Sequence, residues 1–410
     1  MSRALVIGAG VAGPAVAMFL QRAGWEVEIY ESDAEPDPFE GLFLNVATNG
    51  LAVLAELGIR DRLLTDGHRA PRMVMRSGTG RELGTVPNGP AREPERGSVI
   101  VRRGWLHQVI REAALAAGVP FTFGARLVSI EETPTSVRAT FADGRVAEGD
   151  ILIGADGIGS PTRRWIDPEA PEPRYSGLVG TGGYARVAGL EPTPDTQYFV
   201  FGARSFFGYL VRSEGTVFWF ANMTAPQPER GSLRDVPSAQ WLAKLRDLHS
   251  DDPYPVPEIL QNVEGEVGAY PIYDLVGVPK WSRGRVVAIG DAVHATSPSA
   301  GQGASLALED AITLAKCLRD MPDRAGAFAE YQSVRQTRAD RVVTYARVID
   351  SRKRVTKSRL GIAIRDWMMP KFLKNAADDT RNDWLYNHRV DWGSAEGPHQ
   401  PSPHCAGPEA

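Results

Sequence analysis

ALVIGAGVAGPAVAMFLQRAGWEVEIYE, residues 4–31, is the stretch that decides the fold. It has the pattern of a short buried strand, a glycine-rich turn, an apolar helix over 14–23 and a second strand over 26–30. In a dinucleotide-binding turn, the first glycine allows the tight turn, the second lets a pyrophosphate approach the backbone, and the third lets helix and strand pack closely. Gly8, Gly10 and Gly13 have this spacing. The stretch therefore predicts a Rossmann-like βαβ unit.

An acidic residue, Glu31, closes the second strand 18 residues after Gly13. This is near the spacing of about 20 residues at which a carboxylate bonds the ribose hydroxyls of a dinucleotide. A carboxylate here would repel the 2′-phosphate of NADP, so the site is expected to hold NAD or FAD, and the fingerprint does not separate these two. The alternative is a glycine-rich turn in which Glu31 is only a solvated strand end.

Two later stretches repeat the order of buried strand, glycine turn and aspartate. In DILIGADGIGS, residues 150–160, the strand leads to Asp156. In GRVVAIGDAVHATSPSAGQGASLALED, residues 284–310, Asp291 follows a strand, and the loop then contains Pro298, Gly301 and Gly303 before a helix from about residue 304. Open α/β sheets bind ligands at the carboxyl ends of their strands, so two such turns on a chain that already has a dinucleotide turn favour a ligand-binding role. Taken singly, each could be an ordinary βα connection.

Other polar residues lie near predicted helix starts. Residues 99–117 predict an amphipathic helix that begins with Arg102 and Arg103. Cations at a helix N-terminus oppose its dipole, so an anionic ligand would explain them, although solvated arginines are an equal alternative. Asn45 and Asn49 precede a helix that ends at Gly58, and we interpret them as turn and cap residues rather than ligand contacts.

The segment from residue 174 to residue 223 loses helical periodicity and predicts strands over 180–187, 197–201, 205–211 and 216–222. They indicate an antiparallel sheet with one apolar face. Its many aromatic residues could form a wall for a flat apolar substrate, although core packing accounts for most of them. The run 180–183 imitates a second dinucleotide turn, but Gly189 and Pro192 leave no room for the helix that should follow.

Composition excludes several classes of function. Hydrophobic residues make up 43% of the 410 residues and charged residues 23%, as in an ordinary globular protein. The formal charge of −4 gives no indication of a nucleic-acid partner. The two cysteines form neither a disulfide framework nor a zinc motif, so no metal is expected and a cytoplasmic location fits. The apolar run over 4–8 is too short for a signal-peptide core, and no run reaches the roughly 20 residues of a membrane span.

The C-terminal part is basic. Residues 341–374 contain ten Lys and Arg against Asp350 and Asp366. We interpret this run as a solvated helix face, with an anionic membrane surface or an acidic partner as the alternative. The tail from Gly393 is rich in Pro, Gly and Ser and is expected to be disordered.

The three glycine turns together resemble those of the group A flavoprotein monooxygenases, the p-hydroxybenzoate hydroxylase-like family. They match in type and order: GAGVAG with Glu31, then GADGIGSPTR, then GDAVHATSPSAGQGASLALEDA. The resemblance covers roughly residues 3–350 and implies FAD as the cofactor. It implies that Gly8, Gly10, Gly13 and Glu31 hold the ADP half, that Arg103 touches the cofactor, that Asp156 lies near the pyrophosphate, that Asp291 binds the ribityl chain, and that Pro298, Gly301 and Gly303 lie against the flavin ring. One departure is Ser32, where many members have Arg.

The resemblance also implies an activity. It points to a monooxygenase that consumes NADPH or NADH and inserts one oxygen atom from O₂ into an aromatic or polycyclic substrate, through a flavin C4a-hydroperoxide. The flavin carries this chemistry, so no catalytic side chain is assigned. The residues alone leave two alternatives open: a flavin oxidoreductase without oxygen insertion, and a flavin- or NAD-binding protein without catalysis.

The expected fold is α/β. A Rossmann-like FAD-binding domain, with a parallel sheet and a β-meander that includes strands 121–123, 137–141 and 147–148, comprises residues 1–68, 97–175 and 265–345. An inserted antiparallel sheet forms a substrate-binding domain from 69–96 and 176–264. A C-terminal helical region over 346–392 and a disordered tail over 393–410 complete the chain.

Overall fold

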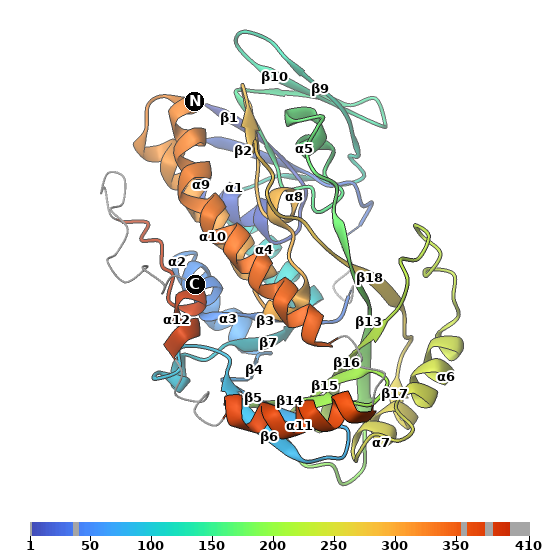
Figure 1. The fold of residues 1–410 in the computed structure, drawn as a ribbon. Coiled ribbons are helices and arrows are strands. Elements are labelled where there is room, and N and C mark those ends of the chain that lie inside the picture. The colour runs from blue at the N-terminus through green and yellow to red at the C-terminus, as the bar shows by residue number, and fades with distance from the viewer. Residues whose placement is uncertain (1, 36–40, 354–358, 374–379, 394–410) are drawn as a thin grey trace.

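The computed structural model describes residues 2–35, 41–353, 359–373 and 380–393 (Figure 1). One half is built on a six-stranded sheet with the order β19-β20-β12-β1-β2-β8. Its strands are β1 (Arg3–Ile7), β2 (Glu26–Tyr30), β8 (Phe121–Thr122), β12 (Ile151–Gly154), β19 (Ser282–Arg283) and β20 (Val286–Ala288). All pairs are parallel except that between β19 and β20. Because β1, β12 and β20 are neighbours, the three glycine turns that follow them meet at one edge of the sheet.

Helices cover this sheet because their apolar residues recur at helical spacing. The helix α1 (Ala12–Arg22) buries every residue from 12 to 20 and packs along α9 (Gly303–Asp320). The long α10 (Arg324–Lys353) lies against α9 and runs toward the other half of the molecule (Figure 1). The remaining helices of this half are α2 (Thr48–Glu56), α3 (Arg60–Leu64), α4 (Arg103–Ala116), α5 (Pro161–Ile166), α8 (Asp291–His294) and the 3₁₀ turn η2 (Pro298–Ala300).

Two local predictions for this half are wrong. The meander consists of β9 (Leu127–Glu132), β10 (Val137–Phe141) and β11 (Val146–Gly149), whereas 121–123 supplies β8 of the parallel sheet. The strand β9 was missed because four of its six residues are exposed and three of these are polar. The predicted helix over 99–117 begins only at Arg103, because the β-branched run over 99–101 forms β7 (Val99–Arg102) between β3 (Phe43–Val46) and β4 (His68–Arg69).

The other half is a large sheet with the order β17-β13-β16-β15-β14-β5-β6, to which β18 adds beside β13. Its strands are β5 (Arg72–Ser77), β6 (Glu82–Pro87), β13 (Arg174–Arg186), β14 (Thr196–Phe201), β15 (Phe206–Val211), β16 (Thr216–Thr224), β17 (Val263–Glu264) and β18 (Ala269–Asp274). The 3₁₀ turn η1 (Pro94–Arg96) follows β6. The predicted α/β fold with a second sheet is confirmed; that sheet is antiparallel except for the parallel pair of β14 and β5, and the imitation glycine turn at 180–183 lies inside β13.

Alternation along the strands gives this sheet two faces. Phe207, Tyr209 and Trp219 pack on one face with residues of α6 (Ser238–Leu248) and α7 (Val256–Gln261). Phe206 and Phe220 point to the opposite face, which lies toward the small sheet β3-β7-β4 because Phe218 of the same face contacts Phe43 of β3. The large sheet therefore presents an aromatic surface to the half that carries the glycine turns.

The C-terminal segment returns to both halves through α11 (Arg359–Leu373), η4 (Thr380–Asn382) and α12 (Asp383–Tyr386), with α11 against β6. The basic run over 341–374 is only partly a solvated face: Arg347 pairs with the buried Asp274, and Arg341 lies over the ring of Trp384. The predicted disordered tail lies, except for Gly393, outside the described residues.

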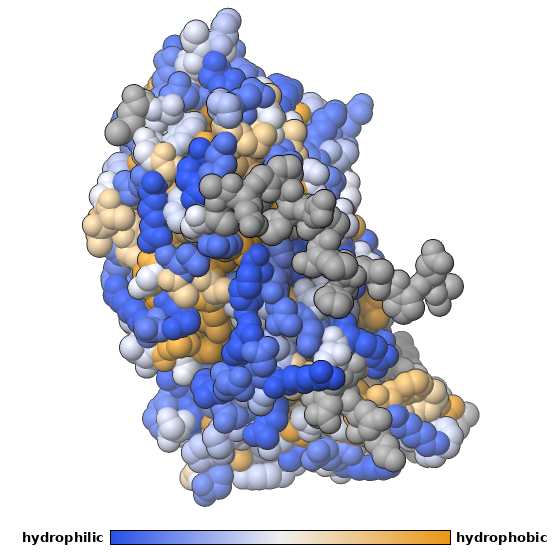
Figure 2. All heavy atoms as spheres, turned by 90° about the vertical axis from the view of Figure 1, so that its left-hand side faces the viewer, coloured by the Kyte–Doolittle hydropathy of each residue, from blue (hydrophilic) through white to orange (hydrophobic). Residues whose placement is uncertain are grey.

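Within the described ranges, no helix is both long and apolar enough to cross a membrane. The same ranges contain no group of three or more His, Cys, Asp or Glu side chains positioned for a metal ion. On the face shown in Figure 2, hydrophilic residues are interspersed with hydrophobic patches.

Candidate functional site

The first glycine turn is shaped by close backbone approach. Gly8 has φ +106°, and a Cβ there would lie 2.3 Å from the carbonyl oxygen of Ala155 in the neighbouring turn. A Cβ on Gly13 would lie 1.9 Å from the carbonyl oxygen of Gly8. Gly10 differs, because nothing lies within 4 Å of its Cβ position. Two of the glycines are therefore required by packing, and the third leaves the turn open to a ligand.

The carboxylate of Glu31 binds this turn directly. Its Oε2 accepts a hydrogen bond of 2.7 Å from the backbone N–H of Ala9, and its Oε1 accepts from the hydroxyl of Ser32 at 2.9 Å. The end of β2 is thus tied to the turn after β1. Ser32, the residue at which the chain departs from many members of the family it resembles, orients the strand-end carboxylate itself.

In the second turn, the aspartate forms hydrogen bonds with residues of the same turn. Asp156 accepts from the hydroxyl of Ser160 at 2.5 Å and from the backbone N–H of Thr162 at 3.0 Å, so it holds the start of α5. Burial raises the pKa of its carboxyl, against these hydrogen bonds. Both oxygens are engaged, while the Cβ positions of Gly157 and Gly159 face open space.

The third turn leaves the side chain of Asp291 accessible to solvent. Asp291 begins α8, its side chain is solvent-exposed, and no hydrogen bond from the described part of the chain reaches its carboxylate. Burial nevertheless raises the pKa of Asp291, and it also raises that of Tyr270, whose side chain is 43% exposed. Because Asp291 and Tyr270 are accessible to solvent and their pKa values are nevertheless raised by burial, we infer that they line a recess. The positive charge of Arg103 lies close enough to lower both pKa values in part.

A side chain of β3 fixes the loop that follows α8. Gly301 adopts a left-handed conformation, its carbonyl accepts a hydrogen bond of 3.0 Å from Asn45 Nδ2, and a Cβ there would lie 2.8 Å from that nitrogen. Pro298 remains exposed, and only a methyl group of Thr296, at 3.6 Å, lies near the Cβ position of Gly303. The interpretation of Asn45 as a turn residue is wrong, because it lies on β3 and supports this loop.

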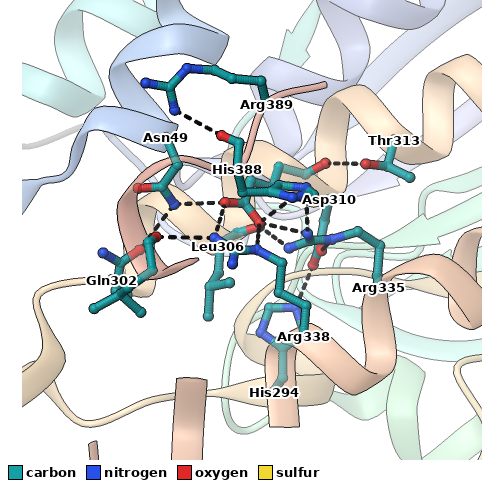
Figure 3. A network of polar contacts seen from close by, with 12 residues as sticks. Asn49, His294, Gln302, Leu306, Asp310, Thr313, Arg335, Arg338, His388 and Arg389 are labelled. Atoms are coloured by element: carbon teal, nitrogen blue, oxygen red, sulfur yellow. Dashed lines mark hydrogen bonds and ion pairs between the residues drawn. The ribbon is translucent and has the colours of Figure 1, made fainter. Parts of the chain in front are cut away.

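A buried network of charged side chains from α9 and α10 fixes the third turn (Figure 3). Asp310 of α9 accepts from the backbone N–H of Gly290 at 2.8 Å, from His294 at 2.5 Å and from Arg335 of α10 at 2.7 Å. Burial alone would raise the pKa of Asp310, but His294 and Arg335 hold it below its usual value. Because Gly290 precedes Asp291, this network fixes the position of the exposed carboxylate.

The neighbouring Glu309 completes the network. It accepts from Asn49 Nδ2 at 2.6 Å and from Arg338 at 2.8 Å, and it also pairs with Arg335. Arg338 and Arg335 hold the pKa of Glu309 well below its usual value in spite of burial. The interpretation of Asn49 as a cap is wrong, since its side chain points into this network. Glu309 and Asp310 were not among the predicted site residues; their signal is a pair of adjacent carboxylates between the apolar runs 306–308 and 311–312 of α9.

The aromatic surface of the large sheet lies beside the loop. The ring centroids of Phe199, Phe206 and Phe220 are 5.5 to 5.9 Å apart, and Phe199 and Phe220 are half-buried. The amine of Lys353, at the end of α10, lies 4.5 Å from the ring centroid of Phe206 and 3.0 Å from the hydroxyl of Ser299 in the loop. The loop and the aromatic surface are therefore neighbours.

These features fit FAD, the group that the sequence resemblance implies. The open backbone at Gly10 suits a pyrophosphate, and Asp291 is a carboxylate free to bond ligand hydroxyls. Arg103 offers a cation within the same recess, and Pro298 with the flanking glycines offers a surface to a flat ring. Nothing in the described part of the site contradicts this fit.

Comparison with known proteins gives consistent matches. Residues 1–346 match the family model described as an FAD binding domain. The chain is 30% identical over 342 residues to the aurachin C monooxygenase/isomerase of Stigmatella aurantiaca, with 82% of this chain and 85% of that one covered. It is 32% identical over 354 residues to the 6-hydroxynicotinate 3-monooxygenase of Bordetella bronchiseptica, covering 83% and 89%. Its structure is similar to that of Klebsiella pneumoniae HpxO complexed with FAD and uric acid, with a TM-score of 0.81, 25% identity, and 94% and 97% covered.

Proposed function

The chain belongs to the FAD-binding-domain family of flavin-dependent monooxygenases, and on that basis we propose its substrate class and the residues that serve its cofactor. It is an FAD-dependent monooxygenase that uses NADPH or NADH, as the sequence resemblance predicted. Membership in this family decides against the two alternatives left open by the residues, a flavin enzyme without oxygen insertion and a protein without catalysis.

The proposed cofactor residues follow the three turns. Gly8, Gly10 and Gly13 would carry the pyrophosphate, with Glu31 beside the adenosine ribose. We assign Arg103 and Asp291 to the sugar-phosphate chain, because both side chains lie in the recess. Pro298, Gly301 and Gly303 would lie along the ring. Asp156 acts through its turn, since both of its carboxylate oxygens are already bonded.

When bound, FAD would supply the redox chemistry by which two electrons from NADPH or NADH activate O₂, so that one oxygen atom enters the substrate and the other leaves as water. The chain's own residues bind and orient the cofactor and the substrate, and they exclude water from the reacting atoms. The fixed loop at Gly301 sets one wall of the reaction space, and the rings of Phe199 and Phe220 set the opposite wall. An apolar wall keeps water from the reacting atoms and strengthens the electrostatic interactions inside.

The proposed substrate is a small, electron-rich aromatic ring that carries a hydroxyl group. Its support is the half-buried aromatic surface beside the loop. The names of similar proteins also support this class: one is a 6-hydroxynicotinate 3-monooxygenase, and one similar structure contains uric acid. We also propose that the two halves are separate domains: residues 1–68, 97–175 and 265–345 for the cofactor, and 69–96 with 176–264 for the substrate.

The test is an oxygen-labelling assay. The purified holoenzyme is incubated with NADH or NADPH, ¹⁸O₂ and a panel of 6-hydroxynicotinate, uric acid, phenols, indoles and polycyclic aromatics. The expected result is accelerated nicotinamide oxidation with one labelled oxygen atom in the product of at least one hydroxylated ring. Labelled product only from rings without a hydroxyl group, or from no member of the panel, would contradict the proposed substrate class.

A further inference from the structure

A lysine is buried where the loop, α10 and the aromatic surface meet. Lys353 is the last residue of α10 and is 8% exposed. Its amine donates to the hydroxyl of Ser299 at 3.0 Å and to Asn222 Oδ1 at 3.3 Å. It also lies 4.5 Å from the ring centroid of Phe206 and 5.5 Å from that of Phe220. The amine is thus in contact with both walls of the proposed reaction space.

A carboxylate one helical turn earlier shares the same serine. Asp350 is 2% exposed, and its Oδ1 accepts a hydrogen bond of 2.5 Å from the hydroxyl of Ser299. Among the residues that the structure describes, no hydrogen-bond donor reaches its buried Oδ2. Ser299 therefore connects the amine to the carboxylate, and it directly follows Pro298, which we assign to the edge of the cofactor ring.

Burial of the Lys353 amine and the Asp350 carboxylate lowers the stability of the fold. A buried amine and a buried carboxylate oxygen without a partner both lose hydration, and such groups are destabilising unless they are fully satisfied. Replacement by apolar residues would be the more stable solution for a purely structural contact. A costly polar group beside a ligand site is typical of a functional residue.

The surrounding charges set the protonation of the amine. Burial lowers the pKa of Lys353 to about 8, with Asp350 opposing the shift, and burial raises the pKa of Asp350. On the sheet side, Asp274 contributes to the raised pKa of Asp350, and Asp274 is itself paired with Arg174 and Arg347. The amine is therefore poised to exchange a proton close to neutral pH, where general bases are most effective.

We propose that Lys353 binds the ring hydroxyl of the substrate and accepts its proton. The O–H bond of the substrate breaks, its electron pair stays on the ring oxygen, and the proton adds to the lone pair of the neutral amine. The resulting ammonium group remains beside the oxygen anion and stabilises it. The ring thereby becomes richer in electrons at its carbon atoms, which favours attack on an electrophilic oxygen. Asp350, through Ser299, keeps the amine oriented. This inference rests on the proposed substrate class.

The first experiment tests whether the amine faces a space that accepts an aromatic ring. The holoenzyme is treated with salicylaldehyde and cyanoborohydride from pH 6 to pH 10, and the labelled lysines are identified by peptide mass spectrometry. Lys353 should be labelled with a midpoint near pH 8. Lys244, an exposed lysine over the ring of Trp241 on the far face of the sheet, is the internal control. Labelling of Lys244 without labelling of Lys353 would overturn the proposal.

The second experiment tests the contact with substrate. A hydroxylated ring that accelerates nicotinamide oxidation should protect Lys353 from labelling, and its methyl ether should not. Equal protection by both compounds, or none by an accelerating one, would overturn the role of Lys353 and leave the proposed function intact. If no hydroxylated ring accelerates oxidation, the proposed substrate class fails and so does this role, even where Lys353 is labelled.

Variants complete the test. Lys353→Met should lower kcat at least 10-fold for a hydroxylated ring while retaining bound FAD, and the rise of kcat with a midpoint near pH 8 should disappear. Lys353→Arg keeps a cation that cannot accept the proton. Its KM should therefore equal that of the unaltered enzyme, whereas its kcat should fall as in Lys353→Met. Lys244→Met is the matched control and should behave as the unaltered enzyme. A Lys353→Met enzyme with unchanged kcat and an unchanged pH profile would refute the proposal.

Discussion

Replacement of Arg335 by methionine should strongly destabilise the cofactor half. Arg335 is fully buried and pairs with two buried carboxylates, Glu309 and Asp310. Removal of one partner from a buried ion pair costs about 3–5 kcal/mol, because a charge is left without compensation. We expect a loss within this range rather than twice as much, since Glu309 keeps Arg338 and Asp310 keeps His294. Against a total stability of about 5–15 kcal/mol, this is a large fraction.

The loss should depend on pH, and its sign follows from the carboxylates. In the unaltered protein, the pKa values of Glu309 and Asp310 are lowered in the folded state. Their contribution is therefore complete above the unfolded pKa of about 4 and is lost only as pH falls through the lowered folded values. Without Arg335 the same buried carboxyls bind protons more readily than before. The deficit of the variant should thus be largest near pH 8 and smaller near pH 5.

The assay is urea unfolding of the holoenzyme followed by circular dichroism at pH 8 and pH 5. The matched control is Arg138→Met, because Arg138 and Glu148 form a half-exposed pair that should contribute less than about 1 kcal/mol. A deficit of Arg335→Met below about 1 kcal/mol, or one equal at both pH values, would refute the electrostatic account of this network.

Three further predictions concern the site. Gly13→Ala should destabilise the apoprotein by about 1–3 kcal/mol or more in urea unfolding, because the added Cβ would contact the carbonyl oxygen of Gly8. Gly10→Ala should leave the stability of the apoprotein unchanged and weaken the binding of FAD. A destabilised Gly10→Ala protein beside a Gly13→Ala protein of unchanged stability would be inconsistent with the turn described. Asp291→Asn should lower FAD affinity about 10-fold in fluorescence titration at an unchanged apoprotein unfolding midpoint, and unaltered affinity would remove Asp291 from the cofactor site. Phe220→Ala should raise KM for an aromatic substrate about 10-fold with FAD content retained, so an unchanged KM would argue against the aromatic wall.

Local patterns predicted the parts of the fold that local sequence determines. The first βαβ unit and the two later turns were predictable because strand, glycine and helix signals lie within about 30 residues. The roles of Asn45 and Asn49 were not, since their partners Gly301 and Glu309 lie 256 and 260 residues away. The start of α4 at Arg103 was also missed, because the preceding residues pair with β3 and β4, a contact that no local period reveals.

The strand order of the parallel sheet has a consequence for synthesis on the ribosome. The strand β1 is made long before its neighbour β12, which begins at residue 151, and before the next strand, β20, which begins at residue 286. Between β12 and β20 the chain produces most of the large sheet, β13 to β18, so that sheet can fold while the parallel sheet is still missing a strand. The parallel sheet is thus begun before most of the large sheet and receives β20 after β13 to β18 have been made, so the three glycine turns can meet only at that late stage.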